Sequence, residues 1–131
     1  MFGCNVDNRG LIPAYREAFE MAQDRNNTVF VFTGGNEGVH GGSPNFRVFS
    51  STPRTITVGA TAFNGSRASY SNVGAAVWIV APAGEHFDKV TWTSSVQNNV
   101  QSCGEVGVGT SYAAPMVSGA AAILRSVSFH C

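Results

Sequence analysis

The chain has 131 residues, a length typical of one domain that can bury a hydrophobic core. Its formal net charge is zero, so it lacks the charge excess expected of a protein that binds nucleic acid or an acidic surface. Charged residues make up 12% of the chain, about half of the usual ~25%, and 44% of the residues are hydrophobic. This composition favours a folded protein of the secreted or cell-surface class.

Three further features are not indicated by the sequence. The longest apolar run, Tyr112 to Leu124, is shorter than the ~20 residues of a transmembrane helix, so we expect no membrane span. The three cysteines, Cys4, Cys103 and Cys131, lack the C-x-x-C spacing of a metal site, and their pairing stays open. The first residues show no basic segment followed by an apolar run, so no signal peptide is apparent.

The first two elements are a helix and a strand. Pro13–Asp24 is predicted to be a helix, because Pro suits the first turn and apolar residues recur along one face. Thr28–Thr33, with the sequence TVFVFT, is a continuous run of β-forming residues, which predicts a strand buried on both faces.

More strands and a second helix follow. Thr55–Ala62 and Ala75–Pro82 are predicted strands, and the segment KVTWTS, residues 89–94, is a candidate for half of a hairpin. A helix from about Thr110 to Arg125 closes the chain. Helices and apolar strands in this order predict an α/β domain with a parallel sheet.

The closing helix is apolar almost all round, which predicts that it is buried. Pro115 is expected in the first turn, where a missing N–H costs no hydrogen bond. Gly119 and Ala120–Ala122 are expected to let the helix lie close to a sheet. Ser111, at the start, faces the positive end of the helix dipole, where free N–H groups could stabilise an oxyanion. A plain serine cap on an Ala-rich helix would explain the same residue.

The stretch Gly109 to Leu124, GTSYAAPMVSGAAAIL, resembles the nucleophile motif of the subtilisin-like serine proteases, G-T-S-x-A-[AS]-P-x-V-[AS]-G, without a gap. The resemblance implies that Ser111 is the nucleophile. Val29–Gly38 is similar to the family's strand that ends in A-x-G-N-[DE]-G, which implies that the side-chain amide of Asn36 donates to the oxyanion. An Asn in a turn before glycine is the alternative interpretation of that residue.

The resemblance extends over nearly the whole chain. Pro53–Glu85 is similar to the stretch between the two motifs and is interpreted as scaffold. Met1–Gly3 is similar to S-[FLW]-G, although Met replaces Ser, which implies that Gly3 lines the substrate pocket opposite Gly34 and Gly35. The implied architecture is a subtilisin-like three-layer α/β fold with a mainly parallel sheet. Residues 1–131 would then form about the C-terminal half of a catalytic domain.

The family also needs Asp in D-[ST]-G and His in H-G-T, both before the Asn, and the chain contains neither motif. Its histidines and aspartates stand in other contexts and are interpreted as surface residues: His40, His86, His130, Asp7, Asp24 and Asp88. We therefore expect an endopeptidase for polypeptides that is inactive until upstream sequence of its own domain supplies Asp and His. A catalytically dead pseudoprotease or peptide-binding relic is the alternative, and a generic α/β binding domain is a third.

No cofactor is expected. Structural calcium occurs in the family, but no metal site is identifiable here. Cys103 and the helix before Thr28 resemble the kexin-like branch, in which a cysteine near the nucleophile pairs with one near the catalytic His. Asn72 stands after SYS, where that branch has an acid, so neither dibasic specificity nor a calcium site is expected.

Overall fold

The computed structural model describes residues 11–26, 28–47, 49–86, 91–97 and 100–128. In chain order the elements are α1 (Leu11–Asn26), β1 (Phe30–Thr33), the short 3-10 helices η1 (Gly38–His40) and η2 (Pro44–Phe46), β2 (Thr55–Thr61), β3 (Ile79–Pro82), β4 (Thr91–Gln97), β5 (Val100–Gly107) and α2 (Thr110–Ser128). The predicted helices and strands are all present, with shifted ends.

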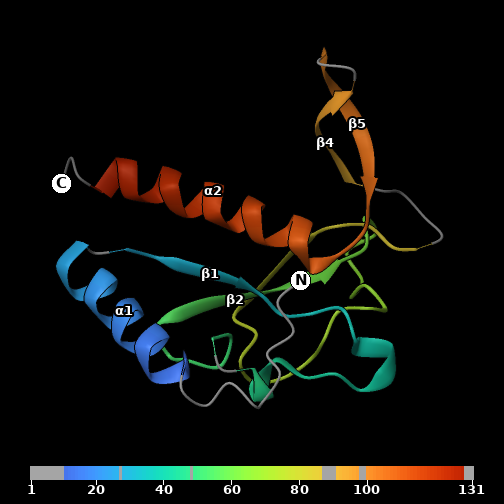
Figure 1. The fold of residues 1–131 in the computed structure, drawn as a ribbon. Helices are drawn as coiled ribbons and strands as arrows, with labels where there is room; N and C mark the ends of the chain where they lie inside the picture. Colours follow the sequence, from blue (N-terminus) through green and yellow to red (C-terminus); the bar gives the residue numbers. More distant parts are fainter. Residues whose placement is uncertain (1–10, 27, 48, 87–90, 98–99, 129–131) are drawn as a thin grey trace.

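The centre of the fold is a parallel sheet with the strand order β1-β2-β3. Phe30 lies opposite Thr55 in the first pair of strands, and Val58 lies opposite Ile79 in the second. Helix α2 lies along one side of this sheet and α1 lies on the other (Figure 1). The predicted α/β architecture with a parallel sheet is therefore confirmed for these strands.

The side chains of β1 alternate between the two helices, as a strand requires. Val31 packs against the core on the α2 side. Phe30 and Phe32 contact the ring of Phe19 in α1, at centroid distances of 4.2 and 5.6 Å. The residues of β1 are only half-buried, so the prediction of a strand buried on both faces is wrong. The physical reason is that β1 lies at the edge of the sheet that the described strands form, with β2 on one side only.

Strand β2 is the most buried element of the sheet. Its fully buried residues Val58 and Ala60 form the core together with residues of α2 and β3. On the opposite face, the hydroxyls of Thr55 and Thr57 donate to the carbonyls of Phe49 and Ser50 at 2.8 and 2.6 Å. These hydrogen bonds compensate the burial of two polar side chains and attach the preceding loop to the sheet.

Helix α2 begins at Thr110, as predicted, but Pro115 is its sixth residue and not part of the first turn. An α-helical carbonyl accepts from the N–H four residues later, and proline has none, so the carbonyl of Ser111 lacks this partner. The placement in the first turn was wrong, because a helix that begins at Thr110 completes its first turn of 3.6 residues before it reaches position 115.

The burial expected for α2 is restricted to one face. Ala113, Ala114 and Val117 pack on the sheet, whereas four large apolar residues are exposed: Met116, Ile123, Leu124 and Val127. A β-carbon added at Gly119 would meet no atom within 4 Å, so Gly119 does not bring the helix close to this sheet. The predictions of a fully buried helix and of a close approach at Gly119 are wrong for the described chain.

The remaining strands differ in their packing. β3 begins at Ile79 and not at Ala75, and Trp78, Ile79 and Val80 are exposed. β4 and β5 form an antiparallel hairpin in which Gln97 lies opposite Val100, and the hairpin projects from the body of the fold (Figure 1). The hairpin predicted around residues 89–94 is confirmed for β4.

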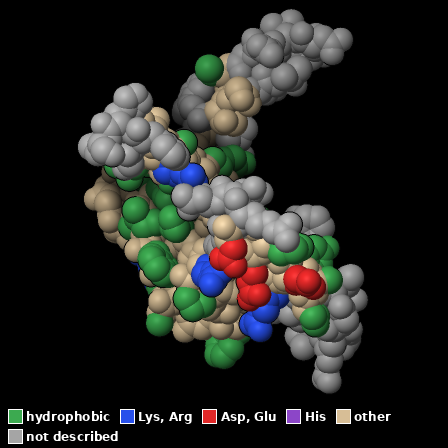
Figure 2. All heavy atoms as spheres, turned by 90° about the vertical axis from the view of Figure 1, so that its left-hand side faces the viewer, with side chains coloured by type: hydrophobic (Ala, Val, Ile, Leu, Met, Phe, Trp, Pro, Cys, Tyr) green, Lys and Arg blue, Asp and Glu red, His purple; other side chains and the backbone are tan. Residues whose placement is uncertain are grey.

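On the face drawn in Figure 2, acidic and basic side chains lie close together, with hydrophobic side chains exposed around them. None of the helices in the described ranges is long and apolar enough to cross a membrane.

Candidate active site

The two candidate catalytic residues, Asn36 and Ser111, lie far apart in the sequence. Asn36 lies shortly after the carboxyl end of β1, and Ser111 is the second residue of α2. The start of α2 lies close to the end of β1 in Figure 1. Parallel α/β sheets bind ligands at the carboxyl ends of their strands, so this edge is where a site is expected.

The side chain of Asn36 is held by Thr110. Its Oδ1 atom accepts from the backbone N–H of Thr110 at 2.9 Å and from the Thr110 hydroxyl at 2.8 Å. A backbone N–H can only donate, so the atom that it contacts must be the oxygen of the amide. The Nδ2 atom therefore points away from Thr110, and no group in the described part of the chain accepts its hydrogens.

The first turn of α2 leaves the backbone N–H of Ser111 available among the described residues. The N–H of Thr110 donates to Asn36, and that of Tyr112 donates to the carbonyl of Gly109 at 3.0 Å. Among the described residues, nothing accepts from the N–H of Ser111. The site thus offers two donors, this N–H and Asn36 Nδ2, which is the donor set that an oxyanion requires.

The approach to Ser111 needs glycine. Gly109 has a φ of +149°, which L side chains rarely adopt. A β-carbon at this position would also lie 3.3 Å from Asn36 Nδ2. The glycine therefore permits both the turn into α2 and the close approach of the Asn36 amide.

The hydroxyl of Ser111 is exposed and has no hydrogen-bond partner within the described ranges. His40 and His86 are also exposed and do not bond to it, while Asp24 pairs with Arg54 at 3.0 Å on the surface. The surface interpretation is confirmed for these three residues. Asp7, Asp88 and His130 lie outside the described residues. No described side chain therefore acts as a general base for Ser111.

The glycines predicted to line the substrate pocket serve internal packing. A β-carbon at Gly34 would lie 3.1 Å from the carbonyl oxygen of Val58. Gly35 has a φ of +100°, and a β-carbon there would collide with Asn72 Nδ2. Packing alone explains why both residues are glycine, and their contact with substrate stays a prediction. Gly3 lies outside the described residues.

A polar cluster that the sequence analysis missed lies beside these glycines. Glu37 accepts from Arg47 at 2.7 Å and from Asn72 Nδ2 at 2.9 Å, and the same Nδ2 donates to the carbonyl of Gly34 at 3.0 Å. Desolvation raises the pKa of Glu37, but the hydrogen bonds from Asn72 and Arg47 and the Arg47 charge outweigh it and lower the pKa. Within the described ranges, the buried Oδ1 of Asn72 has no partner.

The stretch Pro53–Glu85, interpreted as scaffold, therefore supplies residues to this edge of the sheet. Besides Asn72 it contributes Tyr70, whose hydroxyl accepts from the N–H of Gly109 at 3.0 Å. Desolvation by burial raises the pKa of Tyr70, so its hydroxyl stays protonated at neutral pH. The only signal in the sequence was the run SYSN, residues 69–72, and the partner of Tyr70 lies 39 positions away.

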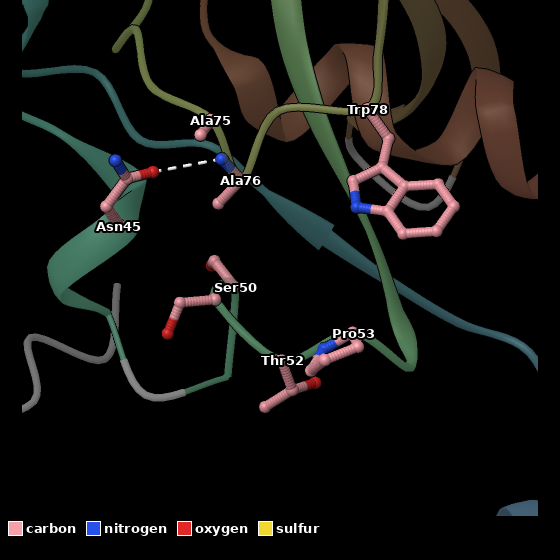
Figure 3. Close-up of a pocket in the computed structure, with 8 residues that line it drawn as sticks. Asn45, Ser50, Thr52, Pro53, Ala75, Ala76 and Trp78 are labelled. Carbon is pink, nitrogen blue, oxygen red and sulfur yellow. Dashed lines mark hydrogen bonds between the residues drawn. The ribbon is translucent and has the colours of Figure 1, made fainter.

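A hollow of about 370 Å³ lies away from these residues (Figure 3). It is bordered by Ser50–Pro53 and by Ala75, Ala76 and Trp78, which places it at the amino ends of β2 and β3. Asn45 Oδ1 accepts from the N–H of Ala76 at 2.9 Å on one side of the hollow, and the exposed ring of Trp78 forms another. The hollow contains none of the candidate catalytic residues. Among the described residues no three His, Cys, Asp or Glu side chains gather as metal ligands would.

Known proteins resemble this chain over most of its length. The model of the Subtilase family matches residues 3–129. The chain is 30% identical over 115 residues to "Kexin" of Candida albicans (strain WO-1), which covers 86% of this chain and 12% of kexin. It is 32% identical over 128 residues to "Subtilisin DY" of Bacillus licheniformis, which covers 95% of this chain and 43% of that protein.

A solved structure agrees with the fold. The "Prenylagaramide maturation protease PagA" superposes with a TM-score of 0.64 at 28% identity, over 88% of this chain and 38% of the other. The predicted subtilisin-like α/β class is thereby confirmed. The chain spans about an eighth of kexin and less than half of Subtilisin DY. With a family match over almost every residue, the chain belongs to the subtilase family.

Proposed function

We propose that this chain carries the nucleophile and the oxyanion donors of a serine endopeptidase. The observation that supports this most strongly is the double hydrogen bond from Thr110 to Asn36 Oδ1. It turns the Asn36 amide nitrogen away from Thr110 and leaves it available to donate. Such preorganised donors contribute to catalysis because they need no rearrangement when charge develops.

In this proposal Ser111 Oγ attacks the carbonyl carbon of a peptide bond, and its proton passes to a histidine. The carbonyl oxygen becomes an oxyanion that accepts hydrogen bonds from Asn36 Nδ2 and the Ser111 N–H. The tetrahedral intermediate collapses, the amine leaves with the proton from the histidine, and an acyl ester remains on Ser111. Water, deprotonated by the same histidine, then hydrolyses the ester.

The histidine and its aspartate would come from polypeptide outside these 131 residues. The exposed apolar face of α2 and the open edge of β1 support this, because both are surfaces that further chain of the same domain could cover. In subtilisin, loss of the nucleophile or the base costs about 10⁶ in kcat, while oxyanion hole and binding retain about 10³–10⁴ over water. We therefore propose that residues 1–131 alone hydrolyse peptides negligibly.

The substrate class is a polypeptide, and the relatives give no narrower guide. One is named "Dibasic-processing endoprotease" (Yarrowia lipolytica) and another "Cuticle-degrading protease" (Metarhizium anisopliae), so similar chains act on different substrates. Secretion is proposed from the low fraction of charged residues.

A catalytically dead relic is the second candidate. The observation that favours it is the absence of a described histidine or acid at Ser111. DNA upstream of the codon for Met1 separates the candidates, because D-[ST]-G and H-G-T motifs in frame support the enzyme.

The proposed activity is tested by co-expressing the chain with a subtilase segment that carries both motifs, and by measuring hydrolysis of an unfolded protein substrate. We expect activity only in the assembled form, its loss in Ser111→Ala, and a fall in kcat of about 10²–10³ in Asn36→Ala. An assembled, folded complex without activity would instead support the relic.

A further inference from the structure

Tyr70 contacts both segments that carry the candidate oxyanion donors. Its backbone carbonyl accepts from the N–H of Gly38 at 2.8 Å, and its hydroxyl accepts from the N–H of Gly109 at 3.0 Å. Gly38 lies two residues after Asn36, and Gly109 lies two residues before Ser111. One residue therefore joins two segments that are far apart in the sequence.

The hydroxyl of Tyr70 is itself held in place. The side chain is 2% exposed, and its hydroxyl donates towards the carbonyls of Ala83 and Gly84 at 3.1 and 2.9 Å. A phenol has one hydrogen to donate, so these two carbonyls share it, and a lone pair remains for Gly109. The hydroxyl thus links the residues after β3 to the turn before α2.

The contact with Tyr70 holds Gly109, which lies in the turn before α2. Gly109 is buried, and its N–H has the Tyr70 hydroxyl as its partner. The carbonyl of Gly109 accepts from Tyr112 in the first turn of the helix. The next residue, Thr110, holds Asn36 and precedes Ser111. A shift of Gly109 would therefore change the distance between the Asn36 amide and the Ser111 N–H.

We infer that Tyr70 is a positioning residue that fixes the separation between the Asn36 amide and the Ser111 N–H. The inference rests on the proposed function, because this separation matters only if the two groups bind one oxyanion. Donors to an oxyanion must lie about 2.7–3.1 Å from it. A misplacement of about 1 Å in a catalytic group can lower the rate about 100-fold.

The structural part of the inference is tested on the 131-residue chain itself. Tyr70→Phe keeps the ring and removes the hydroxyl, and Tyr15→Phe makes the same change at a residue of α1 that is 51% exposed, as a control. We expect hydrogen exchange at the Gly109 N–H, measured by mass spectrometry with residue resolution, to become at least about fivefold faster in Tyr70→Phe, as for one net hydrogen bond. Unchanged exchange at Gly109 would overturn the inference.

The catalytic part is tested in the assembled enzyme. We expect Tyr70→Phe to lower kcat about 10- to 100-fold with little change in KM, and Tyr15→Phe to change neither. In an Asn36→Ala background the effect of Tyr70→Phe should largely disappear, because both changes act on the same oxyanion contacts. A full additive effect, or a lower melting temperature with unchanged kcat, would assign Tyr70 a merely structural role.

The two tests separate failure of the inference from failure of the proposed function. If the assembled native chain shows no activity, the proposed function fails and with it the catalytic role of Tyr70. If the native chain is active and Tyr70→Phe retains full kcat, only the inference about Tyr70 fails.

Discussion

Two groups of Thr110, its backbone N–H and its hydroxyl, donate to the same oxygen of Asn36. Its backbone N–H begins α2, and its hydroxyl shares the Asn36 oxygen with that N–H. The residue is 1% exposed, so water cannot replace either hydrogen bond. The orientation of the Asn36 amide therefore depends on the residue before Ser111 and not on a bound ligand.

We expect Thr110→Val to destabilise the chain by about 1 kcal/mol, because it removes one donor to Asn36 while keeping the volume. Thr110→Ser keeps the hydroxyl but removes a buried methyl group, which costs about 0.8 kcal/mol by itself. Urea unfolding of the native chain and the two variants measures these costs. A Thr110→Val variant as stable as the native chain would show that the hydroxyl does not hold Asn36.

Glu37 makes the stability of this edge dependent on acid pH. Its folded pKa is lowered below the ordinary value of 4.5, although desolvation opposes this, by hydrogen bonds from Asn72 and Arg47 and by the Arg47 charge. A lowered folded pKa stabilises the native state above pH 4.5, and this contribution is lost as the pH falls through the folded pKa. The side chain is 46% exposed, so solvent screening limits its size.

We therefore expect Glu37→Gln to flatten the fall of stability between about pH 5 and pH 3. Arg47→Met should shift that fall toward higher pH, because it removes an ion pair of 2.7 Å. Thermal unfolding across this range is the measurement. If native and Glu37→Gln chains lose stability in parallel, the carboxylate does not contribute.

Helix α2 has a buried and an exposed side, and the two sides should respond differently to the same substitution. Val117 is 8% exposed in the core cluster, whereas Val127 is 64% exposed on the same helix. Val117→Ala should cost about 2 kcal/mol from lost burial and the remaining cavity. Val127→Ala should stay within about 0.5 kcal/mol. Equal costs in denaturant unfolding would contradict the observed seating of the helix.

The elements themselves could be predicted from sequence because their signals are local. Glycine and Thr110 before a small-residue run gave the start of α2, and β-forming runs gave the strands. The partners could not be predicted in this way. Asn36 and Thr110 are 74 positions apart, and only the fold shows that they bond. Likewise, an apolar helix predicts burial but not which polypeptide covers each face, so the outer side of α2 was wrongly expected to be buried within this chain.

At the scale of the whole molecule, the exposed apolar residues of α2 and the uncovered edge of β1 favour association with other chains. We expect the isolated chain to self-associate, because the described residues leave these surfaces uncovered. Sedimentation velocity over a concentration series measures this, with a variant that combines Ile123→Lys and Leu124→Lys as the matched comparison. A native chain that stays monomeric and melts cooperatively would contradict the expectation.

Our central proposal is that Ser111 is a nucleophile whose base lies in other polypeptide. A fluorophosphonate reacts with a serine that a base activates, so it reports on this claim directly. We expect negligible labelling of Ser111 in the 131-residue chain, strong labelling after assembly with a segment that carries D-[ST]-G and H-G-T, and none in Ser111→Ala. Strong labelling of Ser111 in the isolated chain would contradict the account.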